Sequence, residues 1–348
     1  MLGTPQYLTK GGTAKIYRLP GYSLPGEGPL IYKEYLPKTR QAAGPALRPG
    51  LLALVDFRVR LTADRRAQLD QRAIWPLRVV TTPDGRAAGI VIREIPREFF
   101  HGSRPLEFQH LLNADDDARR AGFPVIDLPT RLLLLTRFAE AMMLLHELDI
   151  VFGDVSSLNV GLSLGAKPRV MLVDTDSARQ KRTRGAFGAQ PHTPMWEPPE
   201  ALSAKRQLDY CKRLGTGSAG DLSKLGDTWQ RQTVATDVYK FGLMVVRVLD
   251  YGRQRTQNRR PDKARQVLRS RVSGAAARLL DRTLGDDPKA RPTMEDWYLT
   301  LRGRTASLPP PGRTARPARS AGQPADPDAA SPTGTGWRRV PGTGWVKQ

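Results

Sequence analysis

The sequence has 348 residues, of which 39% are hydrophobic, and this is enough to bury a core in one large domain or in two lobes. It contains no run of about 18 consecutive apolar residues, and its first residues, MLGTPQYLTKGG, lack the apolar region of a secretory signal, so we expect no membrane association and a cytoplasmic protein. The single cysteine, Cys211, excludes an internal disulfide, and four scattered histidines give no zinc-type cluster, so any metal should have oxygen ligands.

The formal net charge of +21 raises the question of nucleic acid, because clustered Lys and Arg displace condensed counterions from phosphates. The sequence shows no helix-turn-helix, zinc-finger or RNP-like pattern, and much of the excess is arginine in an Ala-, Gly- and Pro-rich composition. Direct nucleic-acid binding is disfavoured but stays open, and an anionic partner or a phosphorylated ligand is favoured over it.

Residues 1–97 contain strand-like segments separated by Gly and Pro turns: QYLTKGGTAKIYRL (6–19), PLIYKEYL (29–36) and LRVVTTPDGRAAGIVIREI (77–95). In the last segment TTPDGR places Asp-Gly between two apolar strands, which is the signal of a β-hairpin. Between the second and third segments, LTADRRAQLDQRAIW (61–75) has helical spacing, with Thr62 as N-cap and Asp64 in the first turn. The pattern predicts a small, mostly antiparallel sheet with one helix.

Residues 98–302 have a different character. LPTRLLLLTRFAEAMMLLHEL (128–148) carries Leu134, Phe138, Met142 and Leu145 on one helical face, and a second buried helix is expected after Asp237. Between these helices, VGLSLGAKPRVMLVD (160–174) predicts a β-hairpin. The chain is therefore expected to be α+β, with a small sheet-rich lobe followed by a larger, mainly helical lobe.

Residues 303–348 are rich in Pro, Arg, Ala and Gly and lack apolar periodicity, so they are expected to form a disordered tail. The tail ends in a GTGW repeat with Trp337 and Trp345 eight residues apart. Docking of these tryptophans onto the body or onto a partner and a compositional accident are equally favoured.

The residues that phosphoryl transfer needs appear in order along the chain. The reaction requires positioned phosphates, metal ligands and a group that orients the acceptor hydroxyl. Gly11 and Gly12 lie in a short turn between strands, and Lys33 lies in the strand LIYKEYL. In the larger lobe, Asp154 and Asn159 flank a turn, and Asp174 ends the strand RVMLVD. Each could be an ordinary turn residue, but their order around a buried helix and a hairpin favours a Mg²⁺ site.

The chain resembles the eukaryotic-type Ser/Thr protein kinase family, as a divergent bacterial member, over roughly residues 5–302. Asp154 matches the aspartate of the H-R-D-x-x-x-x-N loop and Asn159 its asparagine, while Asp174 occupies the place of the D-F-G aspartate. Lys33 falls at the V-A-I-K lysine. The resemblance implies a bilobal kinase fold, ATP and Mg²⁺ or Mn²⁺ as cofactors, and catalytic roles for Asp154 and Lys33, with Asn159 and Asp174 on the metal.

The resemblance continues downstream. TPMWEPPE (193–200) is similar to the segment that closes the activation loop, so Thr193 is implied to lie beside Asp154, and Glu200 to pair with Arg291 of the last conserved segment. Asp237, in TDVYKFGLMVVRVL, is implied to brace the catalytic loop. Gly11, Gly12, Ile92, Glu94 and Ile95 are implied to contact the nucleotide, with Ile92 as gatekeeper and residues 93–96 as the hinge that takes the adenine through backbone groups.

Several positions depart from the family pattern. Phe152 and Gly153 replace the His-Arg before Asp154, which makes control by a phosphorylated activation loop less expected. Ser156 stands where a lysine is usual, and Asp176 replaces the D-F-G glycine, where it could add a carboxylate on the metal side. The segment 61–75 has no glutamate to pair with Lys33, which leaves Asp64 or Asp70. The basic insert 204–230 is expected either to recruit an acidic partner or, with slightly more weight, to be a solvated loop.

The favoured function is an ATP-dependent kinase that phosphorylates Ser or Thr of an unidentified protein, in bacterial signalling or a stress response. A pseudokinase or scaffold that binds nucleotide or a partner without efficient turnover is the alternative. A small-molecule kinase is a third, weaker reading, because TPMWEPPE and Arg291 belong to a peptide-binding arrangement.

Overall fold

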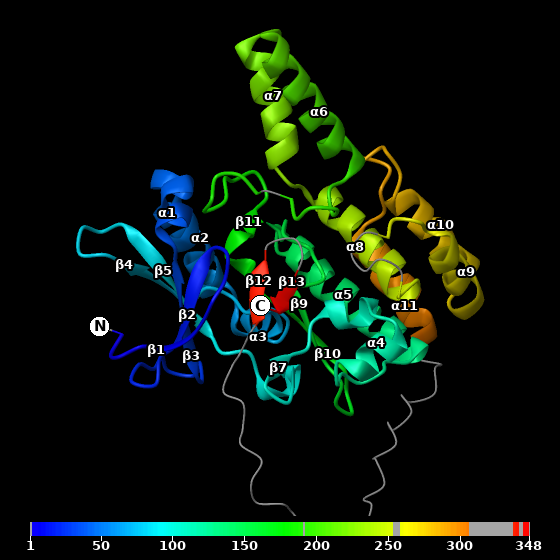
Figure 1. Ribbon diagram of the computed structural model, residues 1–348, viewed down its shortest axis with the longest axis horizontal. Coiled ribbons are helices and arrows are strands. Elements are labelled where there is room, and N and C mark those ends of the chain that lie inside the picture. The colour runs from blue at the N-terminus through cyan, green and yellow to red at the C-terminus, as the bar shows by residue number, and fades with distance from the viewer. Residues whose placement is uncertain (1, 191, 253–257, 306–336, 341–343, 348) are drawn as a thin grey trace, which may run out of the picture.

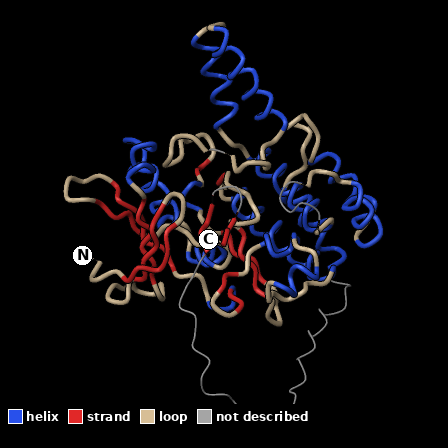
Figure 2. Tube along the Cα trace, viewed as in Figure 1, coloured by secondary structure: helices blue, strands red, loops and turns tan. Residues whose placement is uncertain are grey.

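A computed structural model of the chain describes residues 2–190, 192–252, 258–305, 337–340 and 344–347. In Figure 2 the longer strands gather in one part of the molecule and most helices lie in the other. The predicted α+β architecture, a small antiparallel-sheet lobe followed by a larger, mainly helical lobe, is confirmed.

The small lobe is built on a five-stranded sheet in the order β1-β2-β3-β5-β4, with every neighbouring pair antiparallel. Its strands are β1 (Gln6–Lys10), β2 (Ala14–Arg18), β3 (Leu30–Tyr35), β4 (Arg78–Thr81) and β5 (Ala87–Arg93). The predicted hairpin at TTPDGR joins β4 to β5, and the Thr82 N–H donates to the Arg86 carbonyl at 2.8 Å.

The small lobe also carries α1 (Pro37–Ala43), α2 (Leu47–Arg60) and α3 (Ala63–Asp70). The predicted helix corresponds to α3, which is shorter than expected but begins at its predicted N-cap, where Thr62 Oγ1 accepts from the Arg65 N–H at 3.3 Å. The sequence reasoning missed α1 and α2. Helix α2 contains Pro49 and Gly50, which lower the intrinsic helix propensity of the segment, so packing rather than local preference stabilises it.

Gly50 lets helix α2 approach the backbone of Ala186 very closely. A Cβ atom at Gly50 would collide with the backbone of Ala186 and would lie 2.7 Å from its nitrogen. In contrast, Gly226 in α7 (Ala219–Gln230) has no atom within 4 Å of the equivalent position. The two glycines are both helical, so they form a matched pair.

We therefore expect Gly50→Ala to lower the free energy of unfolding by about 1–3 kcal/mol, because an overpacked contact forces the backbone to shift. Gly226→Ala should be neutral or should stabilise the protein by about 0.5–1 kcal/mol, since alanine has the higher helix propensity. Thermal unfolding of both variants checks this, and equal melting temperatures would show that the close contact has no energetic consequence.

The helices of the larger lobe are α4 (Asp115–Arg120), α5 (Leu128–Glu147), α6 (Pro199–Leu214), α7, α8 (Val234–Leu249), α9 (Asp262–Arg271), α10 (Gly274–Thr283) and α11 (Met294–Thr305). Its short strands are β6 (Phe100–His101), β7 (Arg104–Pro105), β8 (Ile150–Val151), β9 (Val160–Ser163), β10 (Arg169–Leu172) and β11 (Arg179–Gln180). The 3₁₀ turns of the chain are η1 (Gly44–Ala46), η2 (Arg97–Phe99), η3 (Phe108–Leu112) and η4 (Thr175–Ser177).

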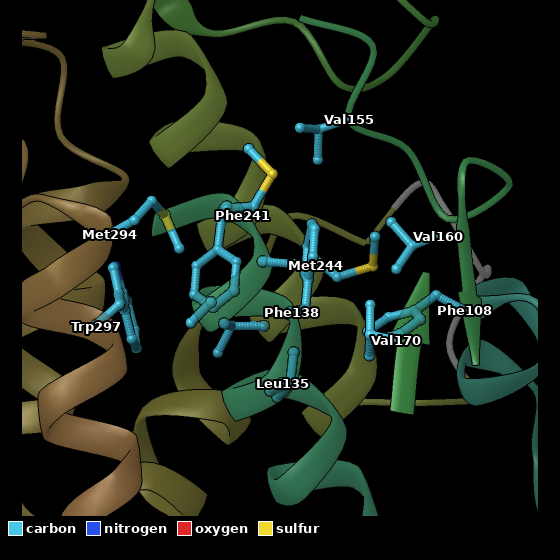
Figure 3. Packing of buried hydrophobic residues seen from close by; sticks show 14 of the residues in the cluster. Phe108, Leu135, Phe138, Val155, Val160, Val170, Phe241, Met244, Met294 and Trp297 are labelled. Atoms are coloured by element: carbon cyan, nitrogen blue, oxygen red, sulfur yellow. The ribbon is translucent and has the colours of Figure 1, made fainter. Parts of the chain in front are cut away.

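The core of the larger lobe lies where α5, α8 and α11 meet (Figure 3). Phe138 of α5 packs on Phe241 of α8 with ring centroids 5.3 Å apart, and Phe241 packs on Trp297 of α11 at 5.2 Å. All three rings are fully buried, which stabilises the fold by roughly 1.5–3 kcal/mol for each side chain. The predicted faces of α5 and α8 therefore point into this core, although α8 begins at Val234, before Asp237.

The segment interpreted as a basic insert forms a helical hairpin rather than a loop. Helices α6 and α7 pack against each other and project away from the rest of the molecule, as Figure 1 shows. Their outer surface leaves Tyr210 and Leu214 more than half exposed, and none of the residues of α7 is buried.

The predicted tail lies mostly outside the described residues, which do not include 306–336. Helix α11 continues to Thr305, and two short strands near the end, β12 (Trp337–Val340) and β13 (Gly344–Lys347), form an antiparallel pair in which Arg339 lies opposite Trp345. Among the helices that the structure describes, none combines the length and apolar character needed to span a bilayer.

Candidate functional site

The loop that carries Asp154 and Asn159 is fixed at both ends by short strand pairs. Strand β8 before the loop pairs with β11, and strand β9 after it pairs with β10. Asp237 of α8 fixes the start of this loop, because its carboxylate accepts from the Phe152 N–H at 2.9 Å and from the Gly153 N–H at 2.8 Å. Asp237 is fully buried and also contacts His146 at 3.2 Å. Charge-assisted hydrogen bonds of this kind fix the backbone that leads into Asp154.

Gly153 is required by the backbone of this loop. Its φ of +77° lies in the region that favours glycine, and a Cβ atom there would lie 2.5 Å from Nε2 of Gln190. Any residue with a Cβ atom at this position would therefore strain the backbone and displace the Gln190 side chain. A cation lies beneath the loop, because the Lys240 ammonium donates to the Gly153 carbonyl at 2.7 Å. Burial lowers the pKa of Lys240 to about 8, although nearby Asp154 and Asp237 act in the opposite direction.

Asp154 presents its carboxylate toward the segment that follows residue 191. Thr193 Oγ1 donates to Asp154 Oδ1 at 2.8 Å, so the threonine lies where the family resemblance implies. The Asn159 amide donates to the Asp154 carbonyl at 2.8 Å, and this leaves its side-chain oxygen as an acceptor. The Asp154 carboxylate is thus held by Thr193, and the Asn159 side chain is held by the backbone of the same turn.

Strand β10 brings Asp174 to the same place. The Val173 N–H donates to the Asn159 carbonyl at 3.0 Å, so the chain just before Asp174 lies against Asn159. Asp174 has φ +56° and ψ +40°, a left-handed conformation that costs about 1 kcal/mol or more for a residue with a Cβ and is concentrated at functional sites. Its side chain is 38% exposed, which leaves the carboxylate accessible.

Lys33 of β3 reaches these carboxylates from the small lobe. Its ammonium lies 3.3 Å from Asp174 Oδ1 and 2.8 Å from Asp176 Oδ1, and only 9% of its side chain is exposed. Burial on its own would lower the pKa of Lys33, but the two carboxylates outweigh it and the pKa is raised. Lys33 is therefore a charged lysine that joins the two lobes.

The prediction that Asp64 or Asp70, in the segment 61–75, pairs with Lys33 was wrong. Asp70 binds Arg58 at 2.6 Å and Arg93 at 2.8 Å instead, and Asp64 is exposed in the first turn of α3. The prediction failed because Asp70, at the end of α3, is neutralised by Arg58 of α2 and by Arg93 of β5. The hypothesis that Asp176 faces the metal is also not supported by its contacts, which are with Lys33 and Tyr35.

The glycines of the predicted phosphate loop form the turn between β1 and β2. The Gly11 N–H donates to the Ala14 carbonyl at 2.8 Å, with Gly12 at the tip. The neighbouring Thr13 carbonyl accepts from the Leu36 N–H at 2.9 Å, which ties the turn to the end of β3. The turn is therefore anchored near the strand that carries Lys33, and its contact with a nucleotide stays a prediction.

The residues predicted to contact the nucleotide base lie at and beyond the end of β5. Ile92 and Ile95 are partly exposed, and they pack with Val173 on the buried side chains of Phe99 and Met171. The side chain of Glu94 points elsewhere, since it binds Arg18 at 2.6 Å, and its N–H donates to the Pro29 carbonyl at 2.9 Å. Ile92, Ile95 and Val173 are thus partly exposed apolar side chains in one cluster, and Val173 directly precedes Asp174.

Glu200 and Arg291 form a bidentate ion pair below the segment that contains Thr193. Two nitrogens of Arg291 donate to the two carboxylate oxygens at 2.8 and 2.6 Å, and the arginine also donates to the Ala235 carbonyl at 3.1 Å. The Arg291 side chain is 1% exposed. The pair connects the start of α6 to α8 and so fixes the approach to Asp154.

The sequence reasoning missed a polar network that holds the segment between Asp174 and Thr193. Gln190 accepts from Arg179 Nε at 3.0 Å and donates to the Ser177 carbonyl at 2.8 Å. Gln232 donates to the Gln190 carbonyl at 2.8 Å, accepts from Lys240 at 2.6 Å, and its own carbonyl accepts from Arg179. Glutamines belong to no distinctive sequence motif. The one available signal was that Gly153 replaces the arginine of the H-R-D pattern, so other polar residues had to hold this segment.

The donor set fits a hard divalent cation bound together with phosphates. Within the described residues no group of three or more His, Cys, Asp or Glu could hold a metal on its own. Mg²⁺ usually takes only one or two protein ligands besides phosphate oxygens and water, so the Asn159 amide oxygen and the Asp174 carboxylate suffice. Asp154, engaged by Thr193, stays available to accept a hydrogen bond from a hydroxyl group.

The site as a whole contains a cation on one side, two oxygen ligands and a positioned carboxylate on the other, and an apolar surface beside them. No protein-family model and no curated protein matches the chain. Among solved structures, the kinase domain of Mycobacterium tuberculosis PknI is similar at 16% sequence identity and a TM-score of 0.49, over 86% of this chain and 94% of that one. At this identity and TM-score the likeness carries no weight for function, which must be inferred from the contacts described above.

Proposed function

We propose that this protein transfers the γ-phosphate of Mg-ATP to serine or threonine hydroxyls of protein substrates. The observation that carries the proposal is the hydrogen bond from Thr193 to the Asp154 carboxylate at 2.8 Å. The loop that contains Asp154 is itself fixed by hydrogen bonds to Asp237. Positioning and electrostatic stabilisation supply most of the catalysis in phosphoryl transfer, so a rigid carboxylate beside oxygen ligands and a lysine is the required arrangement.

Each residue has a distinct task in this proposal. Lys33 would contact the phosphates, and Asn159 with Asp174 would hold a metal ion, which would supply positive charge near the phosphate oxygens. Asp154 accepts the hydrogen bond of the incoming hydroxyl and orients its oxygen toward the phosphate. Ile92, Ile95 and Val173 receive the apolar faces of the base.

A second candidate function is nucleotide binding without efficient transfer. Ser156, at the position of the family's lysine, has an uncharged hydroxyl and is 2% exposed, so it offers no cation to the phosphates. Without another cation in that task, the chain acts as a nucleotide-dependent scaffold, and the projecting α6–α7 hairpin, with Tyr210 and Leu214 exposed, offers a surface to a partner.

The two functions differ in one experiment. Purified protein is incubated with Mg-ATP carrying a labelled γ-phosphate, alone and with a basic test protein, and the Asp174→Ala variant is treated in the same way. Transfer by the wild type that is lost in Asp174→Ala, with folding intact, supports the kinase. A rise in melting temperature with Mg-ATP but no transfer over long incubation supports the scaffold.

A further inference from the structure

We infer that Asp176, together with Tyr35, is the positioning residue that holds Lys33 in place, a task that no acid of the neighbouring helix α2 performs. This inference rests on the proposed function, because it assigns the device that aims the proposed phosphate-binding lysine. It also makes a claim about the protein without nucleotide, which can be tested independently.

The contacts of Asp176 use both of its carboxylate oxygens. Oδ1 accepts from the Lys33 ammonium at 2.8 Å, and Oδ2 accepts from the Tyr35 hydroxyl at 2.6 Å. Lys33 and Tyr35 are two residues apart in β3, so their side chains leave the same face of the sheet. The side chain of Asp176 is 5% exposed. One carboxylate is thereby bound to two donors of a single strand.

Asp174 and Asp176 have different surroundings although they are separated by one residue. Asp174 is 38% exposed and lies farther from the lysine, at 3.3 Å. Asp176 is buried and each of its oxygens already accepts a hydrogen bond, so a metal ion reaches its carboxylate less readily than it reaches that of Asp174. The difference in exposure and hydrogen bonding divides the tasks: Asp174 is accessible to a metal ion, and Asp176 fixes the lysine.

The turn that carries Asp176 is itself anchored. Thr175 Oγ1 donates to the Ile74 carbonyl at 2.6 Å, and both Thr175 and Asp176 are buried within η4. Tyr35 has a further neighbour, since its ring lies edge-on to Phe187 with centroids 5.4 Å apart. The lysine is therefore tied to the loop after β10 and, through Tyr35, to the segment that leads to Thr193.

Helix α2 packs against the sheet with an aliphatic face and offers no acid there. Leu47 and Leu51 are buried beside Tyr35 and Ile90, and the one acidic residue of α2, Asp56, is exposed. The acid that pairs with Lys33 therefore comes from η4, while α2 contributes only apolar contacts beside Tyr35.

A double-mutant cycle on the nucleotide-free protein tests the pairing. Lys33→Met and Asp176→Asn should each lower the melting temperature by several degrees, because each removes one charge of a buried ion pair, even though Asp174 stays near Lys33 and Tyr35 stays bonded to Asp176. The double variant should lose clearly less than the sum of the two. Additive losses would overturn the inference, whether or not the protein transfers phosphate.

Kinetics of the same variants separate a positioning residue from a metal ligand. In Asp176→Asn the ratio kcat/KM for ATP should fall by roughly ten- to a hundredfold, because a misplaced cation loses productive geometry. Tyr35→Phe should show a smaller loss in the same direction. The Mg²⁺ concentration for half-maximal rate should stay close to that of the wild type in Asp176→Asn but rise sharply in Asp174→Asn.

Asp56→Asn on α2 is the matched control and should behave like the wild type. If Asp176→Asn raised the Mg²⁺ requirement as strongly as Asp174→Asn, Asp176 would be a metal ligand and the inference would be wrong. A wild type that neither binds Mg-ATP nor transfers phosphate, with a strongly non-additive stability cycle, would refute the proposed function and leave the pairing of Lys33 with Asp176 intact.

Discussion

Asp154→Asn is expected to lower the rate of phosphate transfer by about 10²–10⁴-fold, while the affinity for Mg-ATP changes little. The amide keeps the size of the carboxylate and can still accept from Thr193, but it loses the negative charge that orients and polarises the attacking hydroxyl. Since Asp154 acts on the acceptor rather than on the nucleotide, the loss should appear in kcat and not in the dissociation constant for Mg-ATP.

Initial rates of transfer, together with calorimetric binding of Mg-ATP, measure these two quantities. Asp149→Asn is the matched control, because Asp149 is an exposed carboxylate five residues earlier that pairs with Lys181. It should transfer phosphate like the wild type. If Asp154→Asn retained full transfer, or lost transfer only through weaker nucleotide binding, the role assigned to Asp154 would be wrong.

Asp237→Asn should lower the free energy of unfolding by about 3–5 kcal/mol, the largest stability effect that we expect from a substitution at the site. The carboxylate accepts from two backbone N–H groups and from His146, and it is fully buried. An asparagine would turn its amide toward one of those N–H groups, so a buried donor would be left without an acceptor. It would also remove a negative charge near the buried Lys240 ammonium.

The loss should be measured as a fall in the denaturant midpoint or in the melting temperature. Asp227→Asn offers the same chemical change on α7, where the carboxylate is 60% exposed and lies 3.6 Å from Arg231. That control should change stability by less than about 0.5 kcal/mol. Equal effects of the two substitutions would show that Asp237 does not brace the loop that carries Asp154.

The larger lobe could be predicted well because its signals are local and strong. Phe138 and Met142 repeat at helical spacing in α5, and the residues that become β9 and β10 are two short, mainly apolar segments around a Gly-Lys-Pro turn. The positions of Asp154, Asn159 and Asp174 in the loops between these elements could be predicted for the same reason. The hydrogen bonds from the Asn159 amide to the Asp154 carbonyl and from the Val173 N–H to the Asn159 carbonyl form between elements that the sequence predicts.

The helices on the small lobe and on the projecting arm could not be predicted in the same way. Pro49 and Gly50 argue against a helix by local propensity, yet α2 forms because it buries Leu51 against the sheet and its glycine permits contact with Ala186. The α6–α7 segment was interpreted as an insert by comparison with a motif spacing, which carries no information about its fold. Its helical hairpin is visible only in the structure (Figure 1).

The partner of Lys33 was missed for a related reason. The search for an acid was confined to the helix at 61–75, whereas the structure places that acid in the turn after β10, 143 residues along the chain. Tertiary contacts of this kind leave no periodic signal. The i, i+2 spacing of Lys33 and Tyr35 in one strand was the one local indication that two donors face the same carboxylate.

Phosphate incorporation measured by mass spectrometry tests the central claim most directly. Purified wild-type protein, Asp154→Asn and Asp174→Ala are each incubated with Mg-ATP and a mixture of basic, serine- and threonine-containing proteins. We predict phosphate on Ser or Thr residues of the mixture or of the chain itself with the wild type, and almost none with either variant. No incorporation by a wild type that binds Mg-ATP, or equal incorporation by all three proteins, would contradict the proposed kinase activity.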